Sequence, residues 1–173
     1  TVDRAAFDQA LDAQRGRGRA KSAFGGVAPA EHFTVSDEAQ MALEQAGDHF
    51  DGFTSATAEH VPVIAVLDER GHDTPALDAG QTGYLALART PFYVESGGQV
   101  SDGGRVYADD GTVEAVVTGM ARGLHAWPRL HRIRVERGTI RRGDRVTAEI
   151  DAALRDATRR HHTATHLLHA ALR

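Results

Sequence analysis

The sequence predicts an α+β fold in which a small β-barrel lies between an N-terminal helical segment and a C-terminal helix. Short β-branched runs separated by glycine-rich turns fill residues 61–150, a pattern typical of a small barrel. Both ends of the chain instead carry apolar side chains at helical spacing. On this basis the 173 residues divide into a helical linker at 1–47, a barrel at 48–150 and a terminal helix at 151–173.

Two helices are expected before the barrel. Asp3 is a suitable N-cap for a helix that runs from Arg4 to the low twenties. Ser36 is a suitable N-cap for a second, short helix over 37–46, which has two acidic residues near its positive end. Gly47 directly follows this second helix, as expected for a residue that ends one.

The barrel strands are expected where short apolar runs lie between turn residues. Six runs meet this description, at 61–67, 84–88, 105–108, 112–118, 130–135 and 145–150. The segment 119–128 is expected to be a loop between two of them. His125, Trp127 and His131 are assigned to packing or to the surface, without a chemical role. Asp151 then caps the terminal helix.

Composition excludes several classes of protein. The chain has no cysteine, so it can build neither a disulfide framework nor a thiolate metal site by itself. No apolar run approaches the roughly 18 residues that a membrane helix needs. The first residues also lack the pattern of a signal peptide. We therefore expect a cytoplasmic location and no membrane partner.

The charge is unevenly distributed along the chain. The net charge of −4 argues against bulk attraction to nucleic acid. However, residues 31–80 carry a net charge of −10, whereas residues 121–145 carry +6. The second segment can attract phosphate groups. It equally fits the solvated surface of a protein that uses arginine in place of lysine.

Two histidines lie one helical turn apart in the terminal helix. His162 and His166 are expected to project from one face with their Cβ atoms about 5–6 Å apart, which suits two ligands of one metal ion. Zinc needs at least three protein ligands, so the others would lie beyond Arg173 or on another molecule. Alternatively, both are polar positions on an ordinary amphipathic helix. Thr163 stands where the H-E-x-x-H signature has glutamate, which argues against a protease.

Two motifs resemble those of a known family. The run H-T-A-T-H-L-L-H at 162–169 resembles the H-x-A-T-H-L-L-H segment in the editing domain of alanyl-tRNA synthetases. Residues 89–104 resemble the family's R-T-x-F-Y-x-E-S-G-G-Q-x-x-D-x-G loop. The resemblance covers most of the chain, and these two motifs in this order are specific. It implies a barrel like that of translation proteins, followed by the first helix of a zinc-binding editing subdomain.

The resemblance also implies a function. Family members attach alanine to tRNA(Ala) using ATP and magnesium, and they hydrolyse tRNA(Ala) that carries serine or glycine. A second site is needed because one missing methyl group is worth only about 1–3 kcal/mol of discrimination. In the family, two histidines and a later C-x-x-x-H segment hold zinc, which implies His162 and His166 as metal ligands. No segment here resembles the aminoacylation motifs, so the chain is expected to hold only part of the editing site.

The motifs imply further site residues. Thr165 is expected at the catalytic site, where its hydroxyl group would bond the serine side chain; the alternative is a bond to its own helix backbone. Thr163 is expected to face elsewhere. Gly97, Gly98 and Gln99 are expected to contact the acceptor end of the tRNA; the alternative is a hairpin turn that needs glycine for its geometry alone.

Two other functions fit the sequence. The chain could be a non-catalytic module that positions tRNA or links domains, or a free-standing alanyl-tRNA editing hydrolase. The long helix expected before the barrel argues against the free-standing protein. We expect the isolated chain to be inactive and to bind zinc weakly or not at all. The parent protein could also form an oligomer.

Overall fold

The structure is a computed structural model that describes residues 33–95, 100–124 and 126–172, with the side chain of His166 left out. The helix expected from Arg4 and the triplet Gly97, Gly98 and Gln99 lie outside the described residues. Residues Phe33–Arg173 form one compact unit. Its described part is mostly β-structure, with one short helix before the strands and a 20-residue helix after them.

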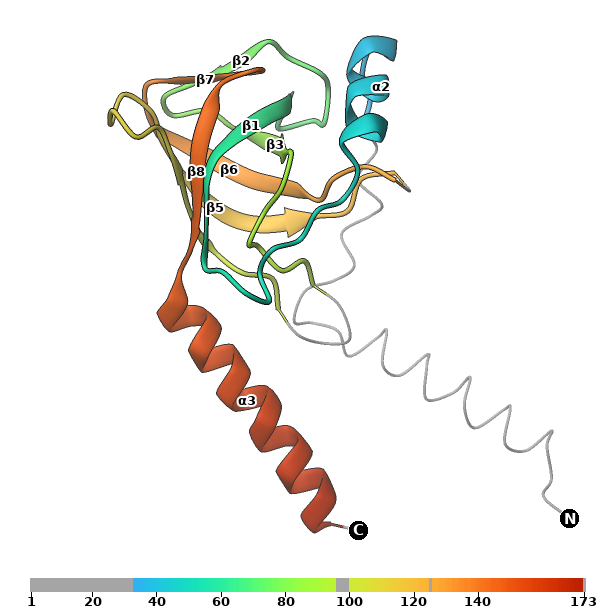
Figure 1. Cartoon of the computed structure of the whole chain (residues 1–173), viewed down its shortest axis with the longest axis vertical. Helices are drawn as coiled ribbons and strands as arrows, with labels where there is room; N and C mark the ends of the chain where they lie inside the picture. The colour runs from blue at the N-terminus through green and yellow to red at the C-terminus, as the bar shows by residue number, and fades with distance from the viewer. Residues whose placement is uncertain (1–32, 96–99, 125, 173) are drawn as a thin grey trace, which may run out of the picture. The chain divides into compact units, whose positions relative to one another are not determined.

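Six antiparallel strands close into a barrel, in the order β1-β3-β6-β5-β4-β8. Figure 1 shows the barrel, with most of its strands labelled. Each of the six expected runs lies wholly or mostly within one of these strands, so the barrel prediction is confirmed. The strands are β1 (Thr57–Asp68), β3 (Thr82–Leu87), β4 (Gly104–Tyr107), β5 (Glu114–Ala121), β6 (Leu130–Arg137) and β8 (Arg145–Ile150).

Two differences from the expected strands concern pairing. Strand β5 continues to Ala121, because Met120 and Ala121 pair with the start of β6; the loop expected at 119–128 is therefore shorter. Strands β2 (Ala76–Asp78) and β7 (Thr139–Arg141) form a separate two-stranded sheet that was not expected. Both contain only three residues and exist because each supplies the other's hydrogen-bonding partner.

The alternation of side chains explains how the strands build the core. Along β6, Ile133 and Val135 are buried, whereas Arg132 and Arg134 are exposed. This period of two places the apolar side chains inside and the arginines outside. Strand β1 is interrupted by register shifts on both of its edges, and His60 has a positive φ of 53° within it. Such breaks in the pairing register, of which β-bulges are one kind, let a long strand bend around a barrel.

Helix α2 (Asp37–Ala46) has the expected ends. The side chain of Ser36 accepts a hydrogen bond from the Ala39 amide at 3.3 Å, and Gly47 follows with a φ of 63°. Leu43 is fully buried in a cluster with Leu67, Trp127 and neighbouring barrel residues. Trp127 therefore packs, as expected, and α2 belongs to the same apolar cluster as one face of the barrel.

Helix α3 (Ala152–Ala171) follows directly on β8 (Figure 1). Asp151 caps it, because its carboxylate accepts a hydrogen bond from the Leu154 amide at 3.0 Å. The predicted terminal helix is therefore confirmed. Most of its described side chains are exposed, including Leu167 and Leu168. Among the described residues, no helix is long and apolar enough to cross a bilayer.

Candidate functional site

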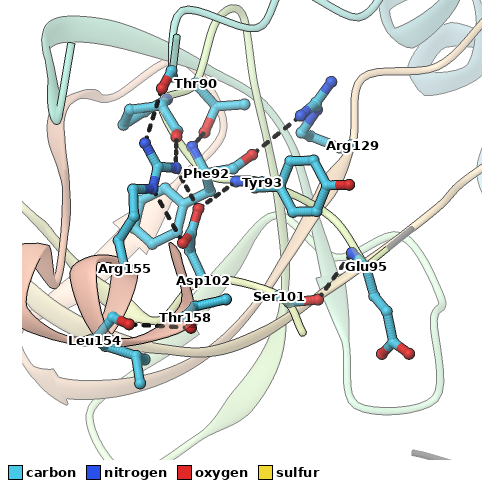
Figure 2. Close-up of polar contacts among 12 residues, drawn as sticks. Thr90, Phe92, Tyr93, Glu95, Ser101, Asp102, Arg129, Leu154, Arg155 and Thr158 are labelled. Atoms are coloured by element: carbon cyan, nitrogen blue, oxygen red, sulfur yellow. Dashed lines mark hydrogen bonds and ion pairs between the residues drawn. The ribbon is translucent and has the colours of Figure 1, made fainter. Parts of the chain in front are cut away.

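The first motif forms a loop whose base is closed by hydrogen bonds. The Tyr93 amide donates to the Asp102 carboxylate at 2.6 Å, and the Asp102 amide donates to the Tyr93 carbonyl at 3.2 Å (Figure 2). Further along, the Glu95 amide donates to the Ser101 hydroxyl group at 3.1 Å. Residues 93–95 and 101–102 are thus held side by side, on either side of the glycine-rich centre of the motif.

Arg155 joins this loop base to the first turns of α3. Its guanidinium forms an ion pair with Asp102, and Nε of Arg155 also lies 3.2 Å from Oδ1 of Asp102 (Figure 2). The remaining nitrogens donate to the Gly52 carbonyl at 2.8 Å and the Pro91 carbonyl at 2.6 Å. The Arg155 side chain is 14% exposed and that of Asp102 is 6% exposed. Only the planar fork of arginine can serve these acceptors together.

A buried hydrogen-bond chain holds the start of the same loop. His131 is fully buried, with Nδ1 3.0 Å from the Leu85 carbonyl and Nε2 2.7 Å from the Thr90 hydroxyl group. A carbonyl can only accept, so Nδ1 carries the proton and Nε2 accepts from Thr90. The Phe92 amide in turn donates to the Thr90 oxygen at 3.1 Å. The neutral form of His131 therefore fixes Thr90 and Phe92.

Burial of His131 predicts a pH-dependent stability. Loss of solvent lowers the pKa of this imidazole to about 4, assisted by the nearby charge of Arg129. Since the unfolded pKa is about 6.5, the unfolded chain takes up the proton first as the pH falls. We expect the free energy of unfolding to drop by about 2 kcal/mol between pH 7 and pH 5 on account of this residue.

Urea denaturation of the chain and of a His131→Gln variant at both pH values measures this contribution. The variant is expected to be less stable at pH 7, because the glutamine cannot match both hydrogen bonds. The decisive quantity is the difference in pH dependence between the two proteins. An equal loss of stability on acidification in both would show that His131 is not responsible.

Arg129 secures the opposite side of the loop. It pairs with Asp48 through Nε at 2.8 Å and donates from Nη1 to the Phe92 carbonyl at 3.1 Å. Although burial opposes ionisation of Asp48, the hydrogen bond and charge of Arg129 hold the pKa of that carboxyl below its usual value. The guanidinium also lies 4.3 Å from the centre of the Phe50 ring, a favourable cation–π distance.

A pocket of about 340 Å³ lies between the loop base and α3. Phe50, Phe53 and Tyr93 supply its aromatic wall, and the rings of Phe50 and Phe53 meet edge to face at 4.9 Å. Helix α3 and the segment before β1 complete the lining with Arg155, Arg159, His162, Thr163 and Gly52. The structure therefore places the first histidine of the second motif in a pocket that Tyr93 of the first motif also lines.

The other predicted site residues are placed less completely. His166 lies one turn after His162 in the continuous helix α3, as the spacing required, but its side chain is not described. The Thr165 hydroxyl group donates to the His161 carbonyl at 2.9 Å, which is the helix-backbone alternative; its oxygen can still accept a second bond. Thr163 does line the pocket, contrary to expectation. Sequence reasoning missed Arg155 and Phe53 altogether.

The chain provides some, but not all, of the ligands that a zinc site needs. Two imidazoles at i and i+4 of one helix suit neighbouring positions of a tetrahedral ion, and His162 opens onto a pocket. Within residues 33–172 as far as they are described, no group of three or more potential ligands is present. Because the chain contains no cysteine, any thiolate ligand must come from outside these 173 residues. The donors fit half of a zinc site.

Comparison with known proteins identifies the family. Residues 1–154 match the model of the class II tRNA synthetases (A). The chain is 40% identical to the alanine–tRNA ligase of Methylococcus capsulatus over 172 residues, and 41% identical to that of Chromohalobacter salexigens over 174 residues. These alignments cover 99% and 100% of the chain but only 18% of either relative. The chain therefore belongs to the class II (A) family of tRNA synthetases and is a homologue of alanine–tRNA ligase.

Proposed function

We propose that the chain is a proofreading segment of an alanine–tRNA ligase and contributes to the hydrolysis of tRNA(Ala) carrying serine or glycine. The observation that carries this proposal is the Arg155 anchor. Its bonds to Asp102, Gly52 and Pro91 fix the helix that bears His162 against the base of the glycine-rich loop. Two motifs that are far apart in the sequence thereby contribute to one site.

We propose a mischarged tRNA as the substrate because a binding site for alanine cannot fully exclude glycine or serine. Glycine is smaller than alanine, and the hydroxyl group of serine is rejected only about a hundredfold by an apolar pocket. Hydroxyl groups such as those of Thr163 and Thr165 can instead recognise serine by its polarity. Attachment of alanine with ATP and magnesium, and tRNA(Ala) as the partner, belong to the parent protein in this proposal.

His162 and His166 would hold zinc as two of its ligands, completed by residues outside this chain. When bound, zinc supplies a positive charge that polarises an ester carbonyl group or orients the substrate. The residues of the chain itself would orient the helix that carries the histidines and line the pocket for the substrate. Arg155 sets the position of α3, and Phe50, Phe53 and Tyr93 provide an apolar wall on one side of the pocket.

The test compares deacylation of seryl-tRNA(Ala) by the full-length ligase that contains this chain, with and without the substitution His162→Ala. We expect hydrolysis to fall to the spontaneous rate in this variant. His161→Ala is the matched control, since His161 is the neighbouring histidine of α3 but does not line the pocket. Unchanged hydrolysis in the His162 variant would refute the proposal.

The isolated chain separates the two alternatives. We expect it to contain less than one equivalent of zinc after dialysis and to leave seryl-tRNA(Ala) intact. Hydrolysis by the isolated chain would favour a free-standing editing protein. A full-length ligase that edits normally after His162→Ala, but loses tRNA affinity when this chain is deleted, would favour a positioning module.

A further inference from the structure

We infer that Arg129 is a positioning residue for the proofreading reaction and acts through the peptide group that joins Phe92 to Tyr93. This inference deepens the proposed function and rests on it. Tyr93 lines the pocket beside His162, so the orientation of its backbone decides where its ring lies. Arg129 itself is not among the described residues that line the pocket. Its effect on the reaction would therefore pass through Tyr93.

Two ion pairs hold this one peptide group by its two polar ends (Figure 2). The Phe92 carbonyl accepts a hydrogen bond from Nη1 of Arg129 at 3.1 Å. The Tyr93 amide, on the other side of the same peptide bond, donates to Oδ2 of Asp102 at 2.6 Å. That carboxylate is in turn paired with Arg155 of α3. The peptide group therefore lies between a cationic donor and an anionic acceptor.

The Arg129 guanidinium is fixed by contacts outside the loop. Its Nε and Nη2 each donate to one carboxylate oxygen of Asp48 at 2.8 Å, which leaves Nη1 for the peptide group. The Arg129 side chain is only 11% exposed, and Asp48 lies two residues after the end of α2. The guanidinium also lies 4.3 Å from the centre of the Phe50 ring, which meets the Tyr93 ring at 6.3 Å. Arg129 thus supports two aromatic side chains of the pocket wall.

The two hydrogen bonds on the peptide group should strengthen each other. Both are charge-assisted, and hydrogen bonds in a chain polarise one another. Phe92 is fully buried and Asp102 is nearly so, which leaves little water to screen the chain of bonds. Loss of either bond would let the peptide plane turn, and Tyr93 would turn with it. Removal of both bonds should then cost little more than removal of one.

The first test measures deacylation of seryl-tRNA(Ala) by the full-length ligase that contains this chain. We expect Arg129→Gln to lower kcat at least about tenfold, because a misplacement of about 1 Å can cost about a hundredfold in rate. KM should stay within about twofold, since much of the affinity for RNA comes from phosphate contacts, which this peptide group does not make. Arg129→Lys should recover only part of the rate, because an ammonium group lacks the planar fork.

Two control variants separate positioning from folding. Ile140→Ala removes a fully buried side chain of β7, in the separate two-stranded sheet, and destabilises the fold without touching the peptide group. Arg137→Gln removes another paired arginine at the far end of β6, whose partner is Glu114 at 3.3 Å. Both should keep kcat within about twofold. A fall in kcat with Ile140→Ala as large as that with Arg129→Gln would mean that Arg129 acts only through stability.

The second test combines Arg129→Gln with Asp102→Asn in a double-mutant cycle on kcat. These two side chains form no hydrogen bond with each other among the described contacts, but both bond the same peptide group. We expect the loss in the double variant to be smaller than the product of the two single losses by at least about threefold. Losses that simply multiply would reject the peptide group as the link between them.

Hydrogen exchange of the Tyr93 amide, followed by NMR in the 173-residue chain, tests the link without any reaction. Arg129→Gln removes a contact only from the carbonyl side, yet it should speed exchange of this amide by at least about tenfold relative to Arg137→Gln. Unchanged exchange would overturn the inference.

The proposed function fails separately. If His162→Ala abolishes deacylation but Arg129→Gln leaves kcat unchanged, proofreading stands and the positioning role is rejected. If His162→Ala leaves deacylation unchanged while Arg129→Gln speeds amide exchange, the link through the peptide group stands and the proofreading proposal falls.

Discussion

Replacing Arg155 by methionine is expected to lower the free energy of unfolding by about 3–5 kcal/mol, the usual cost of removing one partner of a buried ion pair. Methionine fills much of the same volume, so the loss is electrostatic. Asp102 would keep a charge at 6% exposure without its counterion. The carbonyl groups of Gly52 and Pro91 would also lose their donors. Arg155→Lys should recover only part of the loss, because an ammonium group cannot form the planar fork.

Urea denaturation followed by Trp127 fluorescence measures this effect. Arg159→Met is the matched control, one turn along the same helix, and should change stability by no more than about 0.5 kcal/mol. A double-mutant cycle with Asp102→Asn isolates the pair, and a coupling of at least about 1 kcal/mol is expected for residues in direct contact. Equal stability of Arg155→Met and Arg159→Met would contradict the anchoring role.

Phe92→Ala is expected to cost about 3–5 kcal/mol, the range for removing a buried phenylalanine ring. Phe92 is fully buried and packs edge to face on His131, with ring centres 5.3 Å apart. The Phe92 amide donates a hydrogen bond to the Thr90 hydroxyl oxygen, and the Phe92 carbonyl accepts one from Arg129. The cavity would therefore open at the point where both hydrogen-bond networks meet.

The size of the remaining side chain should determine how much stability is lost. Phe92→Leu keeps most of the volume and is expected to cost less than about 1.5 kcal/mol. Phe53→Ala, which removes the same ring from an 88% exposed position, should stay within about 0.5 kcal/mol. A thermal or urea unfolding series of these three variants tests the order. If the Phe92 and Phe53 alanine variants lose equal stability, the burial argument is wrong.

The elements with both an internal pattern and a boundary signal could be predicted from sequence. Helix α2 has its expected ends because Ser36 and Gly47 act within one turn of the residues that they cap. Strand β6 alternates buried and exposed residues, which is a local property. Strands β2 and β7 could not be predicted, since three residues carry too little pattern and their pairing depends on the rest of the fold.

In the candidate site, too, local features could be predicted from the sequence, whereas contacts between distant residues could not. The helical spacing of His162 and His166 is local, so it could be predicted. The pairing of Arg155 with Asp102 joins residues 53 positions apart and has no periodic signature. One signal was available: an aspartate between a strand and a glycine pair, in a loop expected to be tight, needs a cationic partner if it is buried. The interaction of Phe53 with Phe50 likewise appears only in three dimensions.

The anchor at Arg155 also determines how sensitive the histidines are to distant change. His162 lies seven residues beyond it, about 10 Å along the helix axis at 1.5 Å per residue. A rotation of α3 by about 5° around the anchor would move His162 by about 1 Å, and a displacement of that size can reduce a reaction rate by about a hundredfold. Small changes in the barrel that tilt α3 at Arg155 would thus be magnified at His162. Under the proposed function, residues that never meet the substrate would therefore affect the accuracy of proofreading.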